Sequence, residues 1–244
     1  MNKNEWIVKC NHWKNKWPVI QPEYFNDQNG INLYAVLDAV NKHSGIDDVI
    51  MGDAGSISYA GPVALKAKGN QKFIFSPAQA DMGWALPASI GVALSTDRNV
   101  IPIIGDGSFM SNIQELAVVR EHNLNIKFLI LNNSGYLSIK NTQTKYFGGR
   151  VFGTSSETGL WFPDFKQIAK AFDMEYVRIN LVEELNELKV VFKSKKAFLV
   201  DCICTKDQEI LPAQALKNGK QCGLHDMTPF LSDEELTNEM IVTI

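Results

Sequence analysis

Residues 100–108 read Val-Ile-Pro-Ile-Ile-Gly-Asp-Gly-Ser, an apolar run that ends at an acidic residue between two glycines. A second apolar run, residues 126–131, ends at Asn132 and Asn133, and the stretch between the two runs has the pattern of a helix. A strand–helix–strand unit of this kind crosses over right-handed, so both strand ends lie at the same edge of a parallel sheet. We therefore expect the Asp106 carboxylate and the Asn133 amide to face one crevice.

The rest of the chain alternates between strand-like and helix-like segments. Further strands are predicted at residues 48–51, 72–75, 175–179 and 197–204. Helices are predicted at residues 5–17, 30–43, 83–94, 108–122, 164–172 and 181–193. Residues 52–58 read as a Gly/Ser-rich turn, and residues 136–149 as a less regular segment. This alternation predicts an α/β fold, a doubly wound parallel sheet flanked by helices.

Three parts are predicted along the chain. Residues 1–29 form an aromatic helix and a linker, residues 30–206 the α/β domain, and residues 207–244 a C-terminal extension that ends in an acidic turn at 232–239. The first helix carries Trp6, Trp13 and Trp17, which suggests that it packs against another surface.

Composition narrows the class of protein. The chain has 244 residues, a net charge of −3 and no basic run, so we expect no nucleic-acid partner. It has no apolar stretch of membrane-spanning length and no signal-peptide core at its N-terminus, so we expect a cytoplasmic protein without a membrane partner. Its cysteines form no Cys-x-x-Cys pair, and Cys202 and Cys204 alternate along a predicted strand as buried thiols would.

The two strand ends carry the chemistry of a metal and a phosphate. Mg²⁺ prefers hard oxygen ligands such as a carboxylate, an amide carbonyl and phosphate oxygens. The amides of Gly107 and Ser108, at the start of the predicted helix, suit an anion. The chain has neither a Gly-x-x-x-x-Gly-Lys-Ser/Thr nor a Gly-x-Gly-x-x-Gly motif. Spacing alone therefore predicts a metal–phosphate site and leaves open a plain turn and a plain helix cap.

Several motifs in order resemble those of a known family. Gly105 to Phe109, Asn112 to Leu116 and Leu131 to Tyr136 together resemble the thiamine-diphosphate motif of the acetolactate synthase, pyruvate oxidase and decarboxylase family. Residues 76–91 resemble the segment under the cofactor's pyrimidine, and residues 146–150 the loop after the metal site. The resemblance covers nearly the whole chain, and implies the thiamine-diphosphate-binding fold, with residues 30–206 as its diphosphate-binding (PP) domain.

The resemblance also implies a set of site residues. Asp106 and Asn133 would bind Mg²⁺ through their side chains, with the Gly135 carbonyl as a third ligand. Met82 would be the apolar wedge that bends the cofactor, and the Ala80 carbonyl and Met82 amide would hydrogen-bond its pyrimidine. The cofactor-binding residues implied are Ala54, Gly55, Ser56, Ala80, Met82, Gly105, Asp106, Gly107, Ser108, Asn133, Gly135 and Tyr136.

One part of the family's site is not found in this chain. The resemblance implies an activating glutamate that comes from a facing pyrimidine-binding domain, so no catalytic residue is assigned here. The chain is then either one subunit of a split enzyme or the C-terminal part of a longer synthase. The implied reaction is decarboxylation of a 2-keto acid, with or without ligation of the product to a carbonyl acceptor, in a homo- or hetero-oligomer. A requirement for FAD stays open.

Two departures and two alternatives accompany this interpretation. Ser56-Ile57-Ser58 stands where acetolactate synthases have Gln-His-Gln. Residues 53–56 and 225–231 instead resemble synthase homologues associated with surface-polysaccharide biosynthesis. The alternatives are a non-catalytic cofactor-binding or regulatory module associated with a synthase, and a general magnesium–nucleotide binder.

Overall fold

The computed structural model describes residues 2–26 and 29–241. The chain divides into two compact units, Met1–Gln208 and Glu209–Ile244. The first unit contains the sheet and every residue predicted for the site. The three-part division proposed from the sequence stays a prediction.

The first unit is built on a six-stranded parallel sheet. Its strands are β1 Val49–Gly52, β2 Lys72–Phe75, β3 Val100–Gly105, β4 Lys127–Asn132, β5 Glu175–Ile179 and β6 Phe198–Ile203. Their spatial order is β2-β1-β3-β4-β6-β5. The chain therefore leaves β1 toward one edge of the sheet and returns as β3 on the other side of β1. Crevices at such a reversal, outside the carboxyl ends of the strands, are where open α/β sheets bind ligands.

The central strands are apolar because both of their faces are covered. In β3, Val100 and Ile104 belong to the core cluster of one face, whereas Ile101 and Ile103 alternate with them and are also fully buried. Such continuous burial is typical of the interior of a parallel sheet. The predicted crossover is confirmed, since β3 and β4 are parallel neighbours with Gly105 opposite Leu131.

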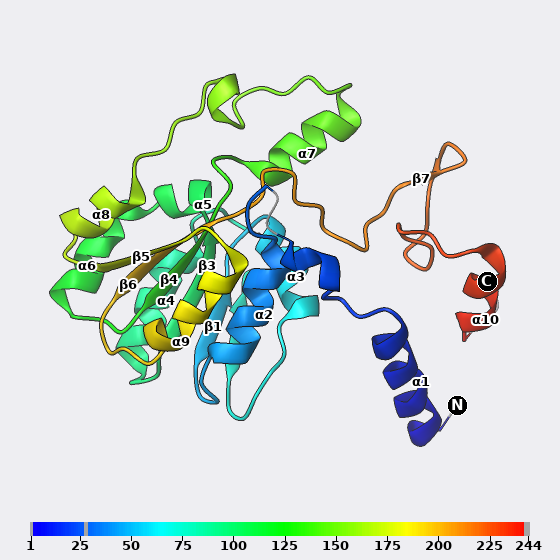
Figure 1. Cartoon of the computed structure of the whole chain (residues 1–244), viewed down its shortest axis with the longest axis horizontal. Helices are drawn as coiled ribbons and strands as arrows, with labels where there is room; N and C mark the ends of the chain where they lie inside the picture. Colours follow the sequence, from blue (N-terminus) through cyan, green and yellow to red (C-terminus); the bar gives the residue numbers. More distant parts are fainter. Residues whose placement is uncertain (1, 27–28, 242–244) are drawn as a thin grey trace. The chain divides into compact units, whose positions relative to one another are not determined.

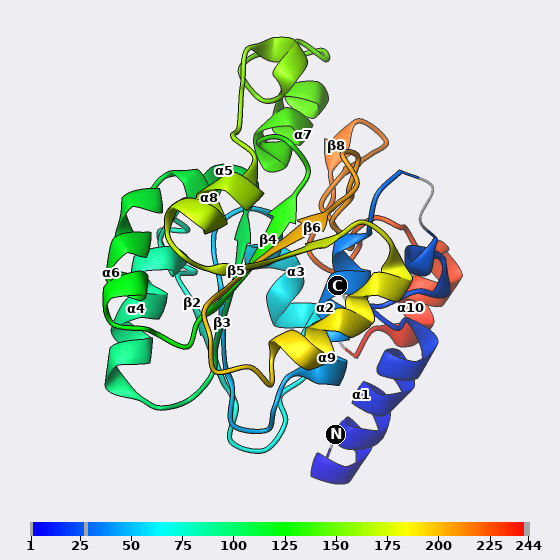
Figure 2. The same cartoon turned by 60° about the vertical axis from the view of Figure 1, so that its left-hand side comes forward.

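Helices cover the sheet in two layers, as Figures 1 and 2 show. The α-helices are α1 Lys3–Lys16, α2 Leu33–His43, α3 Ser56–Ala64, α4 Ala85–Ser95, α5 Asp106–Met110, α6 Leu116–Glu121, α7 Leu137–Tyr146, α8 Phe165–Ala171, α9 Leu188–Val191 and α10 Asp233–Glu239. Helices α4, α5, α6 and α8 pack on one face of the sheet, and α2, α3 and α9 lie together on the other. The doubly wound α/β fold predicted from the sequence is confirmed.

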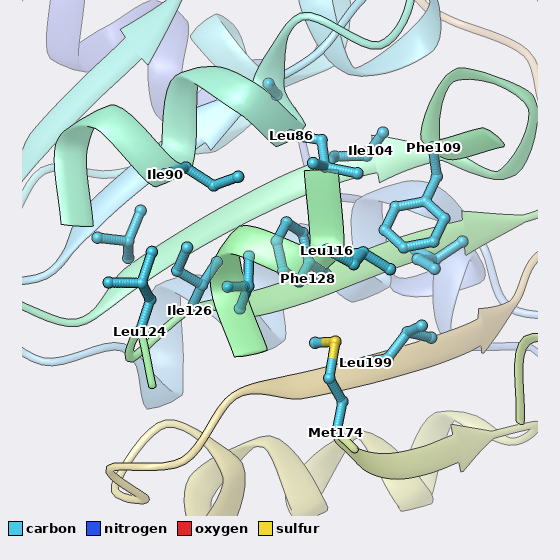
Figure 3. Packing of buried hydrophobic residues seen from close by; sticks show 14 of the residues in the cluster. Leu86, Ile90, Ile104, Phe109, Leu116, Leu124, Ile126, Phe128, Met174 and Leu199 are labelled. Atoms are coloured by element: carbon cyan, nitrogen blue, oxygen red, sulfur yellow. The ribbon is translucent and has the colours of Figure 1, made fainter. Parts of the chain in front are cut away.

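An apolar core lies between the sheet and the layer formed by α4, α5, α6 and α8 (Figure 3). At its centre the Phe109 ring lies edge-on to those of Phe128 and Phe165, with 5.8 Å between ring centroids in each pair. Phe109 belongs to α5, the short helix that begins at Asp106. The core therefore anchors the turn that carries the predicted metal ligand.

Four expectations about local structure were wrong. Residues 56–58, expected to lie in a turn, begin the helix α3. Residues 108–122 are not one helix: α5, a 3-10 turn at Ile113–Glu115 and α6 share this stretch. The break comes at Asn112, whose φ of −134° leaves the helical range and whose amide donates to the Gly83 carbonyl. The segment after residue 136 was expected to be irregular but forms α7, and residues 181–193 form a 3-10 turn, Val182–Glu187, before the short α9.

The second unit contains little regular structure. Two short antiparallel strands, β7 Leu216–Lys217 and β8 Lys220–Gln221, form a hairpin, and the predicted acidic turn is the helix α10. The Lys217 ammonium pairs with Asp226 and Asp233 at 2.8 and 3.3 Å. This ion pair links the hairpin to the start of α10.

Two further expectations concern cysteines and membrane segments. Cys202 and Cys204 are buried free thiols, as predicted from their alternation in the sequence. Within residues 2–26 and 29–241, no helix is both long and apolar enough to span a bilayer.

We expect Phe109→Ala to lower the free energy of unfolding by about 3–5 kcal/mol, because it removes a fully buried ring from the centre of the core. Phe152→Ala is the matched control, since that ring is 81% exposed and its loss should change stability by no more than about 0.5 kcal/mol. Chemical denaturation of both variants measures the difference. Equal losses would contradict the packing described here.

Candidate functional site

A cleft lies at the carboxyl edge of the sheet, where the chain leaves β1, β3 and β4. Every residue predicted to bind the cofactor lines this cleft, with the exception of Ala80. The lining residues that were predicted are Ala54, Gly55, Ser56, Met82, Gly105, Asp106, Gly107, Ser108, Asn133, Gly135 and Tyr136. Segments more than 80 positions apart in the sequence thus meet at one place.

Asp106 joins two of the turns that line the cleft. Its side chain is 1% exposed, and its carboxylate accepts hydrogen bonds from the backbone N–H groups of Gly107 at 2.7 Å and Gly135 at 3.1 Å. Burial raises the pKa of Asp106 to about 7, and the backbone N–H groups that favour the ionised form offset part of that rise. The Gly107 N–H, expected to meet a diphosphate, is thus directed at Asp106 in this structure.

The oxygen donors at this point suit a hard cation. Asp106 supplies a carboxylate, and Asn133 and Gly135 lie beside it in the cleft wall with an amide and a backbone carbonyl. In the described part of the chain, no three or more His, Cys, Asp or Glu side chains form a group that could hold a metal. A metal here would therefore depend on a single carboxylate, neutral protein oxygens and ligand oxygens, a set that Mg²⁺ commonly uses.

Glycine is required at different positions of the cleft for different structural reasons. A Cβ on Gly135 would lie 2.3 Å from the Thr154 carbonyl oxygen, and a Cβ on Gly107 would lie 2.1 Å from the Tyr136 ring. A Cβ on Gly105 would meet no atom within 4 Å. Gly135 therefore allows two backbone segments to approach closely, whereas Gly105 keeps open space in the cleft itself.

The segment predicted to lie under a pyrimidine forms another part of the wall. Met82 lines the cleft and is 40% exposed, which leaves an apolar side chain available to a ligand. It stands between Ala80 and Gly83, which both have positive φ values, 52° and 87°. This tight turn brings Met82 to the cleft, and the backbone of Ala80 stands outside the lining.

Asp53 is a residue that the sequence analysis did not assign to the site. Its buried carboxylate accepts N–H groups of Ala54 at 2.6 Å, Gly83 at 3.1 Å and Ala85 at 3.3 Å. It therefore fastens the turn after β1 to the turn that carries Met82. Burial raises the pKa of Asp53 to about 6. The signal was present in the sequence, because Gly52-Asp53 ends one strand as Gly105-Asp106 ends its neighbour.

Three residues after β6 complete the floor of the cleft: Cys204, Thr205 and Gln208. The buried Gln208 side chain accepts the N–H of Leu33, at the start of α2, at 2.7 Å. Burial raises the pKa of the Cys204 thiol well above its usual range, so the thiol stays protonated. Their positions follow from the strand order, which no local motif reveals.

Comparison with known proteins gives the same interpretation. Residues 53–202 match the family model described as thiamine pyrophosphate enzyme, C-terminal TPP binding domain. The chain belongs to this family. The matched segment begins at Asp53 and contains both strand-end acids and every turn of the cleft between β1 and β4.

Acetolactate synthases are among the proteins similar to this chain. The large subunit of Pyropia yezoensis is 27% identical over 90% of this chain and 37% of its own length. That of Lactococcus lactis is 24% identical over 91% of this chain and 38% of its own length. Acetolactate synthase 3 of Brassica napus is 33% identical over 54% of this chain. The chain thus spans about two fifths of the large subunits that it matches, as their TPP-binding domain.

We expect Gly135→Ala to destabilise the TPP-binding domain by about 1–3 kcal/mol, because the new Cβ meets a backbone carbonyl that cannot move by itself. Gly105→Ala is the control, since its Cβ points into open space and its effect on the ligand-free protein should stay within about 1 kcal/mol. Denaturant unfolding of the ligand-free variants compares the two. If Gly135→Ala leaves stability unchanged while Gly105→Ala lowers it, the contacts described for these two glycines are wrong.

The raised pKa of Asp53 predicts that the free energy of unfolding depends on pH. Its pKa is about 6 in the folded chain against the usual 3.8 of an aspartate, so between pH 4 and pH 6 the folded state keeps a proton that the unfolded state releases. The stability that protonated Asp53 contributes is therefore full below pH 4 and lost as the pH rises through 6. We expect the unfolding free energy of wild type relative to Asp53→Asn to fall by on the order of 2 kcal/mol over this range. A difference that does not change with pH would contradict this.

Proposed function

We propose that this chain binds thiamine diphosphate and Mg²⁺ as part of an acetolactate synthase-like enzyme that decarboxylates a 2-keto acid. The observation that carries the proposal is the convergence of Asp106, Asn133 and Gly135 on one cleft of a TPP-binding domain. The names of the relatives support the substrate class, because they are acetolactate synthases. Ligation of the product to a carbonyl acceptor is part of the same proposal.

The residues of the cleft fit both groups. Asp106, Asn133 and the Gly135 carbonyl would hold Mg²⁺, and the metal's charge would favour the ionised form of Asp106 despite its burial. The open space beside Gly105 would admit the diphosphate, with Ser108 on one side of it and the turn at residues 54–56 on the other. When bound, thiamine diphosphate supplies the electron sink for cleavage of the bond next to a carbonyl.

Met82 would orient the cofactor. Its exposed side chain offers an unbranched, polarizable surface that can fill an irregular gap beneath a bent ligand. Asp53 would hold the turn that carries Met82 in place relative to the turn at residues 54–56, because its carboxylate accepts N–H groups from both turns.

The acid that activates the cofactor would come from another domain or subunit. Asp106 is the one carboxylate among the described residues that line the cleft, and it is engaged by two backbone N–H groups. We therefore propose a pyrimidine-binding partner, in the same polypeptide or in another, and a cytoplasmic oligomer. The sequence similarity at residues 225–231 favours a role in surface-polysaccharide biosynthesis.

A non-catalytic module is the second candidate, favoured by the same shortage of acids in the cleft. The two functions separate on one measurement, which is 2-keto acid turnover after addition of a pyrimidine-binding domain that carries the activating glutamate. Turnover that disappears in Asp106→Ala identifies an enzyme half. Cofactor binding without turnover identifies a module.

We expect Asp106→Ala to weaken Mg²⁺-dependent binding of thiamine diphosphate by at least about tenfold, because it removes the charged ligand of the metal. Titration calorimetry at saturating Mg²⁺ measures this affinity. Asp97→Ala is the control, since Asp97 is an exposed acid that does not line the cleft. Unchanged affinity in Asp106→Ala would refute the site, and a preference for ATP would favour the nucleotide binder.

A further inference from the structure

A buried hydrogen-bond network stands behind the turn that carries Asn133 and Gly135. At its centre is Asp201 on β6, whose side chain is 2% exposed. One carboxylate oxygen accepts the Asn132 amide N–H at 2.8 Å, and the other accepts the Tyr176 hydroxyl at 2.9 Å. The network thus joins three neighbouring strands, β4, β6 and β5.

The sheet register puts these three side chains on one face. Asp201 is opposite Ile130 on β4 and Arg178 on β5, so Asn132 and Tyr176 each stand two residues from the position opposite it. Residues two apart on a strand share a face, and such diagonal neighbours are within reach of long side chains. The contacts therefore follow from the register of the strands.

Asn132 continues the network into the cleft wall. Its side-chain oxygen accepts the N–H of Ser134 at 3.2 Å. Ser134 has a φ of 58°, in the left-handed region that residues other than glycine enter only with local support. The next residue, Gly135, donates its N–H to Asp106 at 3.1 Å. A continuous series of hydrogen bonds thus runs from Tyr176 through Asp201, Asn132 and the turn to Asp106.

We propose that Asp201 is a positioning residue of the cofactor site, which fixes the orientation of the Asn132 amide and thereby the turn that presents Asn133 and Gly135. The inference rests on the proposed function for its consequence in metal binding. It divides the roles of two adjacent asparagines: Asn133 lines the cleft, and Asn132 supports the turn from behind.

The physical basis is the asymmetry of an amide side chain. With its N–H on Asp201, Asn132 must offer its oxygen to Ser134. Rotation by 180° would place that oxygen against the carboxylate and an N–H against the Ser134 N–H, two repulsive contacts at once. The carboxylate of Asp201 therefore selects one orientation. Tyr176 satisfies its second oxygen, and burial beside Asp201 raises the pKa of Tyr176, so the hydroxyl stays a donor.

The test compares Asp201→Ala with Asp201→Asn. Alanine removes the acceptor, whereas asparagine keeps an oxygen that can accept the Asn132 N–H. We expect hydrogen exchange of the Ser134 and Gly135 amides in the cofactor-free chain to become about tenfold faster in Asp201→Ala, measured relative to the core amides of β3. In Asp201→Asn we expect exchange within about threefold of wild type.

A second measurement reports on the metal. We expect the affinity for Mn²⁺ with thiamine diphosphate, followed by electron paramagnetic resonance, to fall by about tenfold in Asp201→Ala and to be largely restored in Asp201→Asn. Asn132→Ala breaks the same link from its other end, so the double variant should lose no more than either single one. It also provides a test if Asp201→Ala fails to fold.

Three results would overturn the inference: turn amides that exchange no faster than wild type, turn and core amides that loosen equally, or Asp201→Asn as impaired as Asp201→Ala. Failure of the proposed function is a distinct result. In that case the wild-type chain binds Mn²⁺ with thiamine diphosphate no more tightly than Asp106→Ala does. The exchange measurement on the cofactor-free chain still decides whether Asp201 holds the turn.

Discussion

The site depends on the need to satisfy a carboxylate that is buried at the end of a central strand. Asp106 has lost almost all contact with water, so backbone N–H groups must replace it. One of these groups belongs to Gly135, which follows the next strand of the sheet. The turn after β4 therefore cannot adopt an arbitrary course, since it must bring an N–H to Asp106. The same hydrogen bond holds the Asp106 carboxylate beside Gly135, whose carbonyl oxygen is another proposed metal ligand.

This arrangement recurs at the neighbouring strand. Asp53, after β1, accepts N–H groups from its own turn and from the turn before α4, as Asp106 does for the turns after β3 and β4. Burial raises the pKa of both carboxyl groups, so each acid is kept in a medium that disfavours its charge. The two buried acids, at adjacent strand ends, join the turns of the cleft by hydrogen bonds. A positive ion beside Asp106 would favour its ionised form.

The sequence predicted what local pattern determines. Residues 72–75 and 175–179 were predicted with the bounds that the structure has, because each is a short segment rich in aromatic and β-branched residues. The break near Asn112 was missed because its partner, the Gly83 carbonyl, lies 29 positions away. The role of Asp201 was missed for the same reason, since its partners stand on two other strands. Family motifs predicted the residues of the cleft, but only the coordinates distinguish Gly135, which a carbonyl crowds, from Gly105, which borders open space.

The proposal that this domain acts with a partner has a physical basis in the cleft. Under the proposed function, the glutamate that activates the cofactor would have to direct its carboxyl group at the pyrimidine ring. Asp106 and Asp53 direct their oxygen atoms at backbone N–H groups, and rotation of either side chain would break hydrogen bonds that join the turns of the wall. The exposed Met82 side chain offers the cofactor an apolar surface but no carboxyl group. The acids of the cleft are thus occupied in holding its turns, which is a physical reason for the proposal that a separate domain supplies the activating acid.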